Sequence, residues 1–140
     1  MKLILSVWFA AFFIQASAQE FSVSAGKKSL VVFADDDNTN KALEIKSETI
    51  GDSLLTIFVN NDEIGEDWKR NFSICDSSGN ILQDFLQAQD GSYYIKMSGL
   101  KTVWNPDSKY FIYTIALPKD PQTDELVKVA RILVCKIKIR

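Results

Sequence analysis

The feature that most restricts the fold of this chain is a two-residue alternation of apolar and polar side chains, which recurs in short segments after residue 18. Such alternation places successive side chains on opposite faces of a β-strand. Clusters of Gly, Asn, Asp and Pro separate the segments, as turns require. Helical periodicity is scarce. The pattern predicts an all-β chain of about seven or eight strands.

The expected strands differ in how many of their faces are apolar. Residues 53–60 and 109–117 are apolar on both faces, which predicts central positions in their sheets. Residues 72–76 and 81–85 flank a turn in which Gly79 can supply a positive φ, so they are expected to form a β-hairpin. The remaining strands are expected at residues 30–33, 43–47, 92–98 and 127–140, the last with a bulge near Arg131. On that last strand Leu133, Cys135, Ile137 and Ile139 are expected to face the core.

The segment from residue 93 to residue 117 resembles the strand, corner and strand of immunoglobulin-like and fibronectin-type-III-like domains. In this resemblance Leu100 fills the corner and Tyr110 opens the next strand. The resemblance implies a β-sandwich, and residues 19–140 are expected to form one such domain. It implies no activity, because a fold alone carries no function.

The first eighteen residues have the organisation of a secretory signal peptide. Lys2 precedes an apolar run from residue 3 to residue 14, and Ala16 and Ala18 occupy the −3 and −1 positions of a cleavage site. The run is shorter than the roughly 20 residues that span a bilayer. We therefore predict cleavage after Ala18 and export of a soluble domain, either to a periplasm or to the extracellular space.

Composition excludes several classes of function. The chain has no histidine, which removes Ser-His-Asp and Cys-His catalysis in their usual forms and the commonest zinc ligand. The formal net charge of −2 becomes −3 when Lys2 is removed, which provides no basic footprint for nucleic acid. We therefore expect a protein that is not an enzyme, needs no cofactor and binds no nucleic acid.

Two acidic clusters were weighed as sites of carboxylate or metal chemistry. Glu63, Glu66 and Asp67 lie close together beside Trp68, but they are interpreted as a solvated loop. Residues 35–40 offer oxygen ligands at alternate positions, yet they lack the glycine and the glutamate of the EF-hand pattern. They are interpreted as a polar turn, and no metal site is predicted.

The two cysteines, Cys75 and Cys135, allow two interpretations. An exported chain meets an oxidising compartment, where such a pair tends to form a disulfide. A closed loop of about 60 residues would stabilise the fold by roughly 4 kcal/mol. The alternative is two separate buried thiols. The strand patterns support this alternative. Cys75 follows Ile74 and is expected on the opposite face of the strand from it, whereas Cys135 lies on the apolar face of its own strand.

Exposed aromatic residues are the candidate binding residues. Trp68 and Trp104 are expected at loop edges, and Tyr94 shares a strand face with Lys96. Each could instead pack at the margin of the core. We predict a non-catalytic binding module that uses its loops and these aromatics to contact a protein or a glycan. The alternative is a structural or assembly component that docks through a strand edge or its basic last strand.

Overall fold

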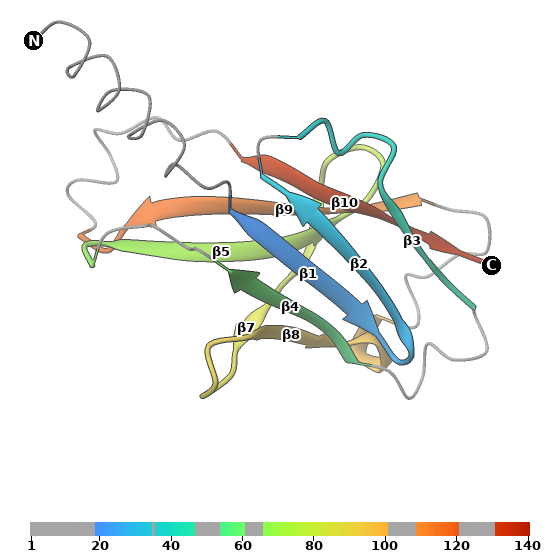
Figure 1. Cartoon of the computed structure of the whole chain (residues 1–140), viewed down its shortest axis with the longest axis horizontal. Coiled ribbons are helices and arrows are strands. Elements are labelled where there is room, and N and C mark those ends of the chain that lie inside the picture. The colour runs from blue at the N-terminus through green and yellow to red at the C-terminus, as the bar shows by residue number, and fades with distance from the viewer. Residues whose placement is uncertain (1–18, 35, 47–53, 61–65, 101–108, 121–130) are drawn as a thin grey trace, which may run out of the picture.

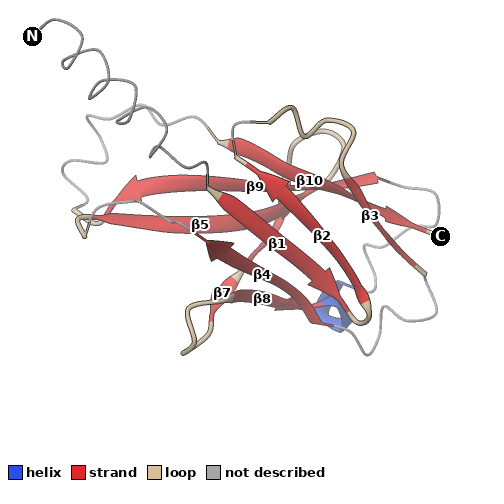
Figure 2. Cartoon of the chain, viewed as in Figure 1, coloured by secondary structure: helices blue, strands red, loops and turns tan. Residues whose placement is uncertain are grey.

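The computed structural model is all-β, with two five-stranded sheets packed against each other (Figure 1). It describes residues 19–34, 36–46, 54–60, 66–100, 109–120 and 131–140. Within these ranges the helical element is a short 3-10 segment, Met97–Leu100 (Figure 2). Strands β1, β2 and β4 run at an oblique angle to β5 and β9 in this view. The predicted sandwich of two sheets is therefore confirmed.

Sheet A has the strand order β2–β1–β4–β8–β7, and every neighbouring pair in it is antiparallel. Its strands are β1 (Glu20–Ala25), β2 (Lys28–Phe33), β4 (Leu54–Asn60), β7 (Leu86–Gln87) and β8 (Tyr93–Lys96). Sheet B has the order β3–β10–β9–β5–β6, in which β3 alone among the described strands pairs in parallel, with β10. Its strands are β3 (Ala42–Ile45), β5 (Trp68–Cys75), β6 (Ile81–Asp84), β9 (Lys109–Pro118) and β10 (Ile132–Ile139).

The core lies between the two sheets and is centred on Phe72 of β5, which is fully buried. Its ring meets Phe21 of sheet A edge-on at a centroid distance of 5.7 Å. Tyr93, also of sheet A, lies 4.7 Å away, and Phe85 lies 6.2 Å away. Aromatic pairs in such geometries add to the stabilisation from burial alone. These contacts fix how the two sheets sit on each other, and therefore which faces point outward.

The predicted central strands are confirmed, because β4 lies between β1 and β8, and β9 lies between β5 and β10. The predicted hairpin is also present as β5 and β6, and Gly79 in its turn has a φ of 85°. Strand β1 was not predicted, although its apolar side chains alternate with serines as a half-buried strand requires. The two-residue β7 is too short to carry an alternating pattern.

The last strand departs from the expected pattern at one point. A register shift between Leu133 and Cys135 marks the bulge that was predicted near Arg131. Because of this shift Val134 is fully buried, and Leu133, which was predicted to face the core, is only half-buried. Beyond the bulge the prediction is confirmed, since Cys135, Ile137 and Ile139 are buried.

Candidate functional site

Of the three predicted binding aromatics, the structure describes Tyr94 and Trp68 and does not bring these two together. Tyr94 is half-buried in β8 of sheet A. Trp68 is half-buried as the first residue of β5 in sheet B, where it pairs with Pro118. Trp104 lies outside the described residues. Tyr94 and Trp68 therefore belong to different sheets and do not form one surface.

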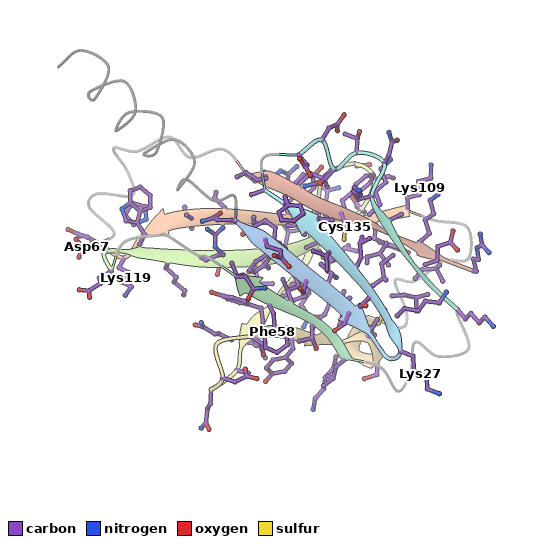
Figure 3. All side chains as sticks on the ribbon, viewed as in Figure 1. Lys27, Phe58, Asp67, Lys109, Lys119 and Cys135 are labelled. Atoms are coloured by element: carbon purple, nitrogen blue, oxygen red, sulfur yellow. The ribbon has the colours of Figure 1, made fainter. Side chains whose placement is uncertain are left out.

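Trp68 borders a depression of about 590 Å³ at one end of sheet B. The Lys119 N–H donates to the Asp67 carbonyl at 2.8 Å, which closes this end of the β5–β9 pair. Figure 3 shows Asp67 and Lys119 next to each other at that end. Asp120 adds a second acid to the lining. The rim is therefore of mixed charge, and Trp68 supplies its large apolar side chain.

A larger apolar surface covers the outer side of sheet A, which faces away from the core. Five large apolar residues there are 40–58% exposed, and the half-buried Tyr94 joins them. Their exposed area is roughly 360–600 Å², if each residue fully exposed presents on the order of 150–250 Å². This lies within the range for the largest apolar patch on a soluble monomer. The surface, called the apolar face below, consists of Val31, Phe33, Leu54, Phe58, Leu86 and Tyr94.

The strand register arranges the apolar face in rows. Ser22 of β1 pairs with Val31 on one side and with Phe58 on the other, so these three form a row across β2, β1 and β4. A neighbouring row runs from Thr56 through Tyr94 to Leu86. Figure 3 shows Phe58 on the side of β4 that points away from β5. The large side chains are thus separated only by small hydroxyl residues.

Charged residues stand only at the two ends of the described apolar face. Glu20, which pairs with Phe33 and Asn60, lies at one end. Lys96, which pairs with Leu54, lies at the other. The outward positions that the structure describes between them carry serine, threonine or apolar side chains. The surface is therefore apolar in its middle and oppositely charged at its ends.

The outer side of sheet B also carries apolar residues, and cations cover two of its aromatic rings. The Arg131 guanidinium lies 4.2 Å from the centroid of the Tyr113 ring. The Lys136 ammonium lies 5.9 Å from the centroid of the Phe111 ring, and the two rings stack at 6.4 Å. Long cationic side chains cover apolar surface with their stems while the charge stays in water. Phe111 and Tyr113 are accordingly only half-exposed.

Arg131 also ties the start of β10 to the β5–β6 turn. Its Nη1 donates to the Gly79 carbonyl at 3.3 Å and contacts Cys75 Sγ at 3.7 Å. A Cβ at Gly79 would lie 3.0 Å from Arg131 Nη2, and the positive φ already disfavours any other residue there. Arg131 therefore closes sheet B over Cys75.

Of the two interpretations of the cysteines, the disulfide is wrong and the pair of separate buried thiols is confirmed, because Cys75 and Cys135 are both free and fully buried. Strand β9 separates their strands, which puts them about 10 Å apart at the usual spacing, whereas a bridge requires Cα atoms within about 7 Å. Burial raises the pKa of Cys75, and the Arg131 guanidinium opposes this shift. Burial also raises the pKa of Cys135, to about 12. Both thiols are therefore protonated and shielded near neutral pH.

Within the described part of the chain, no cluster of three or more His, Cys, Asp or Glu residues could hold a metal ion. In the acidic segment 35–40, Asp37 accepts hydrogen bonds from the Thr39 hydroxyl and N–H, which lower its pKa. Glu66 and Asp67 are exposed, and Glu63 lies outside the described ranges. No helix among the residues searched is long and apolar enough to cross a bilayer.

Known proteins offer no guide to this surface. No protein-family model matches the chain, and no curated protein matches it either. Sequence reasoning missed the apolar face because Leu54 and Phe58 were interpreted as the second buried face of a central strand. The signal that could have found it is the pair Val31 and Phe33, which are apolar and outward on an edge strand.

Proposed function

We propose that this chain is an exported, non-catalytic interaction module that binds a protein partner through the apolar face of sheet A. The observation that carries the proposal is the set of five large, exposed apolar side chains on one sheet surface whose charged residues, Glu20 and Lys96, stand at its two ends. The largest apolar patch on a soluble monomer has about this size and is often functional. Export is the part of the proposal that rests on residues 1–18, whose sequence has the organisation of a signal peptide.

A protein fits this surface better than a glycan does. Sugar recognition combines aromatic stacking with several placed hydrogen-bonding groups. Here Val31, Leu54 and Leu86 are aliphatic, and the hydroxyl groups between the large side chains are few and small. The centre of a protein interface is depleted of charge and rich in such side chains. Tyr94 adds an aromatic residue with a polar end, a type favoured in interfaces.

The charges at the two ends of the face define the partner's chemistry. Glu20 and Lys96 stand at opposite ends, with the uncharged rows between them. A complementary partner would present an apolar patch with a cation facing Glu20 and an anion facing Lys96. Such an arrangement fixes orientation and disfavours wrong partners more than it adds affinity.

The strand order supports an immunoglobulin-like topology, which we propose as the finer description of the sandwich. Strands β1, β4, β8 and β7 follow the order of strands A, B, E and D, and β5, β9 and β10 follow C, F and G. The buried Tyr110 near the start of β9 occupies the place of the corner tyrosine. Strand β2 is then an addition beside strand A, and it supplies Val31 and Phe33.

An assembly role is the second candidate, and one observation favours it. Strand β2 has β1 as its only strand neighbour in sheet A, so its other edge is not paired within that sheet. The same edge borders the apolar face. The basic last strand supports this role less, because Lys136 lies over Phe111 and Arg140 pairs with Glu44 at 2.9 Å.

Site-specific photo-crosslinking tests the proposal. The full chain, produced with its first eighteen residues in the cells that make it, would carry a photoreactive side chain in place of Phe58. The matched control places the same group at Ile81, which is 59% exposed on sheet B. We expect one discrete adduct from position 58 and none from position 81. An adduct of twice the chain mass would select the assembly role, and equal or absent crosslinking at both positions would rule out the apolar face.

A further inference from the structure

Gln19 is the residue that cleavage after Ala18 would leave at the N-terminus, and the fold holds it at two points. Its carbonyl accepts a hydrogen bond from the Ala34 N–H at 2.9 Å. Its side-chain Oε1 accepts one from Arg70 Nη2 at 3.2 Å. First residues are usually frayed unless they are tied down in this way. The mature N-terminus is therefore part of the fold and not a loose tail.

The partner of Gln19 is a buried cation. Arg70 is only 5% exposed, lies 5.7 Å from the centroid of the Phe21 ring, and donates from Nη1 to Thr114 Oγ1 at 3.2 Å. A buried guanidinium interacts with nearby charges far more strongly than an exposed one, because little water screens it. A charge that forms on Gln19 therefore interacts strongly with the Arg70 guanidinium.

Cleavage would create such a charge. It converts the peptide nitrogen of Gln19 into an α-ammonium group, one side chain away from the Arg70 guanidinium. Two cations at this separation repel each other, which disfavours the protonated amine. The repulsion disappears if the new terminus becomes a neutral amide.

We propose that Gln19 is a modification site, at which the exported chain cyclises to an N-terminal pyroglutamate with the assistance of Arg70. The inference rests on the export part of the proposed function. In the reaction the neutral α-amine attacks the side-chain Cδ, and a bond forms between the α-nitrogen and Cδ. The bond between Cδ and Nε2 breaks, and ammonia leaves with the proton of the amine. No electrons are gained or lost, and no co-reactant is needed.

Arg70 favours this step in two ways. Its hydrogen bond to Oε1 withdraws electron density from the Cδ carbonyl and stabilises the oxyanion that forms on attack. Its charge favours the unprotonated form of the attacking amine. The lactam retains the Cδ carbonyl oxygen, so the product still offers Arg70 a hydrogen-bond acceptor. The modified terminus carries no charge and adds no second cation beside the guanidinium.

The first test is the N-terminal mass of the full chain, produced with its first eighteen residues and recovered after export. We expect a chain that starts at residue 19 and is lighter than the unmodified sequence by one ammonia. The Gln19→Asn variant is the matched control, because its shorter side chain does not form the five-membered lactam. A chain that starts at an intact Gln19 overturns the modification and leaves export standing. A chain that retains residues 1–18, or starts elsewhere, overturns export and this inference with it.

The second test separates assistance by Arg70 from spontaneous chemistry. Protein with a free Gln19 terminus, released in vitro by a specific protease, is incubated either folded or in urea, and ammonia loss is followed by mass spectrometry. We expect cyclisation to be roughly tenfold to hundredfold faster in the folded protein. Equal rates would contradict a role for Arg70. The Arg70→Lys variant should lower the folded rate toward the urea rate, and its circular dichroism spectrum reports whether it remains folded.

Discussion

The outer faces of the two sheets share one sequence pattern, a central strand with outward apolar side chains, but differ in how far those side chains are exposed. The central strands β4 and β9 both place large apolar side chains on their outward sides. In sheet B these residues are half-buried beneath Arg131 and Lys136. In sheet A Phe58 and Leu54 are nearly half-exposed, at 46% and 49%. An apolar central strand is therefore not enough to say whether its outer face is covered by the chain itself.

The neighbouring strand decides the difference. Strand β10 presents Lys136 beside Phe111, and a long aliphatic stem can lie across a ring. Strand β1 presents Ser22 beside Phe58, and a serine is too short to cover a phenylalanine. Phe111 and Tyr113 of sheet B are thus shielded by the chain itself, whereas Phe58 of sheet A belongs to an apolar surface that a partner can bury.

The largest expected effect concerns binding by sheet A. With a photoreactive group at Leu86, the substitution Phe58→Asp should remove the crosslinked adduct, because a carboxylate in the centre of an apolar interface costs about 2–4 kcal/mol of binding. Ile81→Asp is the control on sheet B and should leave the adduct yield unchanged. A persistent adduct in the Phe58→Asp variant would show that the rows around Phe58 are not in the interface.

Two side-chain substitutions to alanine should affect stability more on sheet B than on sheet A, the reverse of the expected effect on binding. Phe111→Ala removes a ring that stacks on Tyr113 beneath Lys136, so it should lower the free energy of unfolding by about 1–2 kcal/mol. Phe58→Ala should lower it by a smaller amount, about 0.5 kcal/mol, because its side chain is already nearly half-exposed. Urea denaturation of both variants measures this, and equal losses would mean that the two faces are equally packed.

Alkaline pH should weaken the fold through the interior thiol. The pKa of Cys135 is about 12 in the folded chain, against about 8.5 for an unfolded cysteine. Between these values the unfolded chain releases the proton while the folded chain keeps it, so stability is full below about pH 8.5 and falls as the pH rises. The loss approaches about 1 kcal/mol per pH unit. Cys135→Ala should flatten the dependence, and an unchanged slope would contradict the burial of this thiol.

The smallest of the main effects should come from removing the Arg131 side chain, which covers Tyr113 on the outer side of sheet B. Arg131→Ala removes the cation above Tyr113 and the hydrogen bond to the Gly79 carbonyl, which should cost about 0.5–1 kcal/mol. It should also let Cys75 react with a thiol reagent faster than in the native protein, since Arg131 contacts its sulfur. Arg131→Lys keeps the charge without the planar guanidinium. Its stability and its Cys75 reactivity should therefore lie between those of the native protein and of Arg131→Ala. No change in Cys75 labelling would show that other groups shield it.

Much of the fold could be predicted from the sequence, because alternation and turn residues act locally. The central positions of β4 and β9 and the hairpin around Gly79 follow from such patterns. Strand β1 escaped prediction although its apolar residues alternate with serines, which is the pattern of a half-buried strand. The disulfide prediction failed because sequence does not reveal that β9 lies between Cys75 and Cys135.

The candidate site was less accessible to prediction than the fold. Tyr94 shares the outward side of β8 with Lys96 but is half-buried, and Trp68 lies on the other sheet. Exposure of Phe58 depends on which side chains stand beside it after pairing, and pairing partners are distant in sequence. The contact between Gln19 and Arg70 likewise joins residues 51 positions apart. Such features emerge only when the register of both sheets is known.

The most direct test of the binding surface is the reactivity of a single cysteine placed in its middle. Ser22→Cys introduces a thiol between Val31 and Phe58, and the native Cys75 and Cys135 are buried and should not react. Ser77→Cys, in the exposed β5–β6 turn, is the control. We expect position 22 to react with a maleimide in the purified protein but to be protected in the producing cells, while position 77 reacts in both. Equal labelling of position 22 in both settings would contradict a partner on the apolar face.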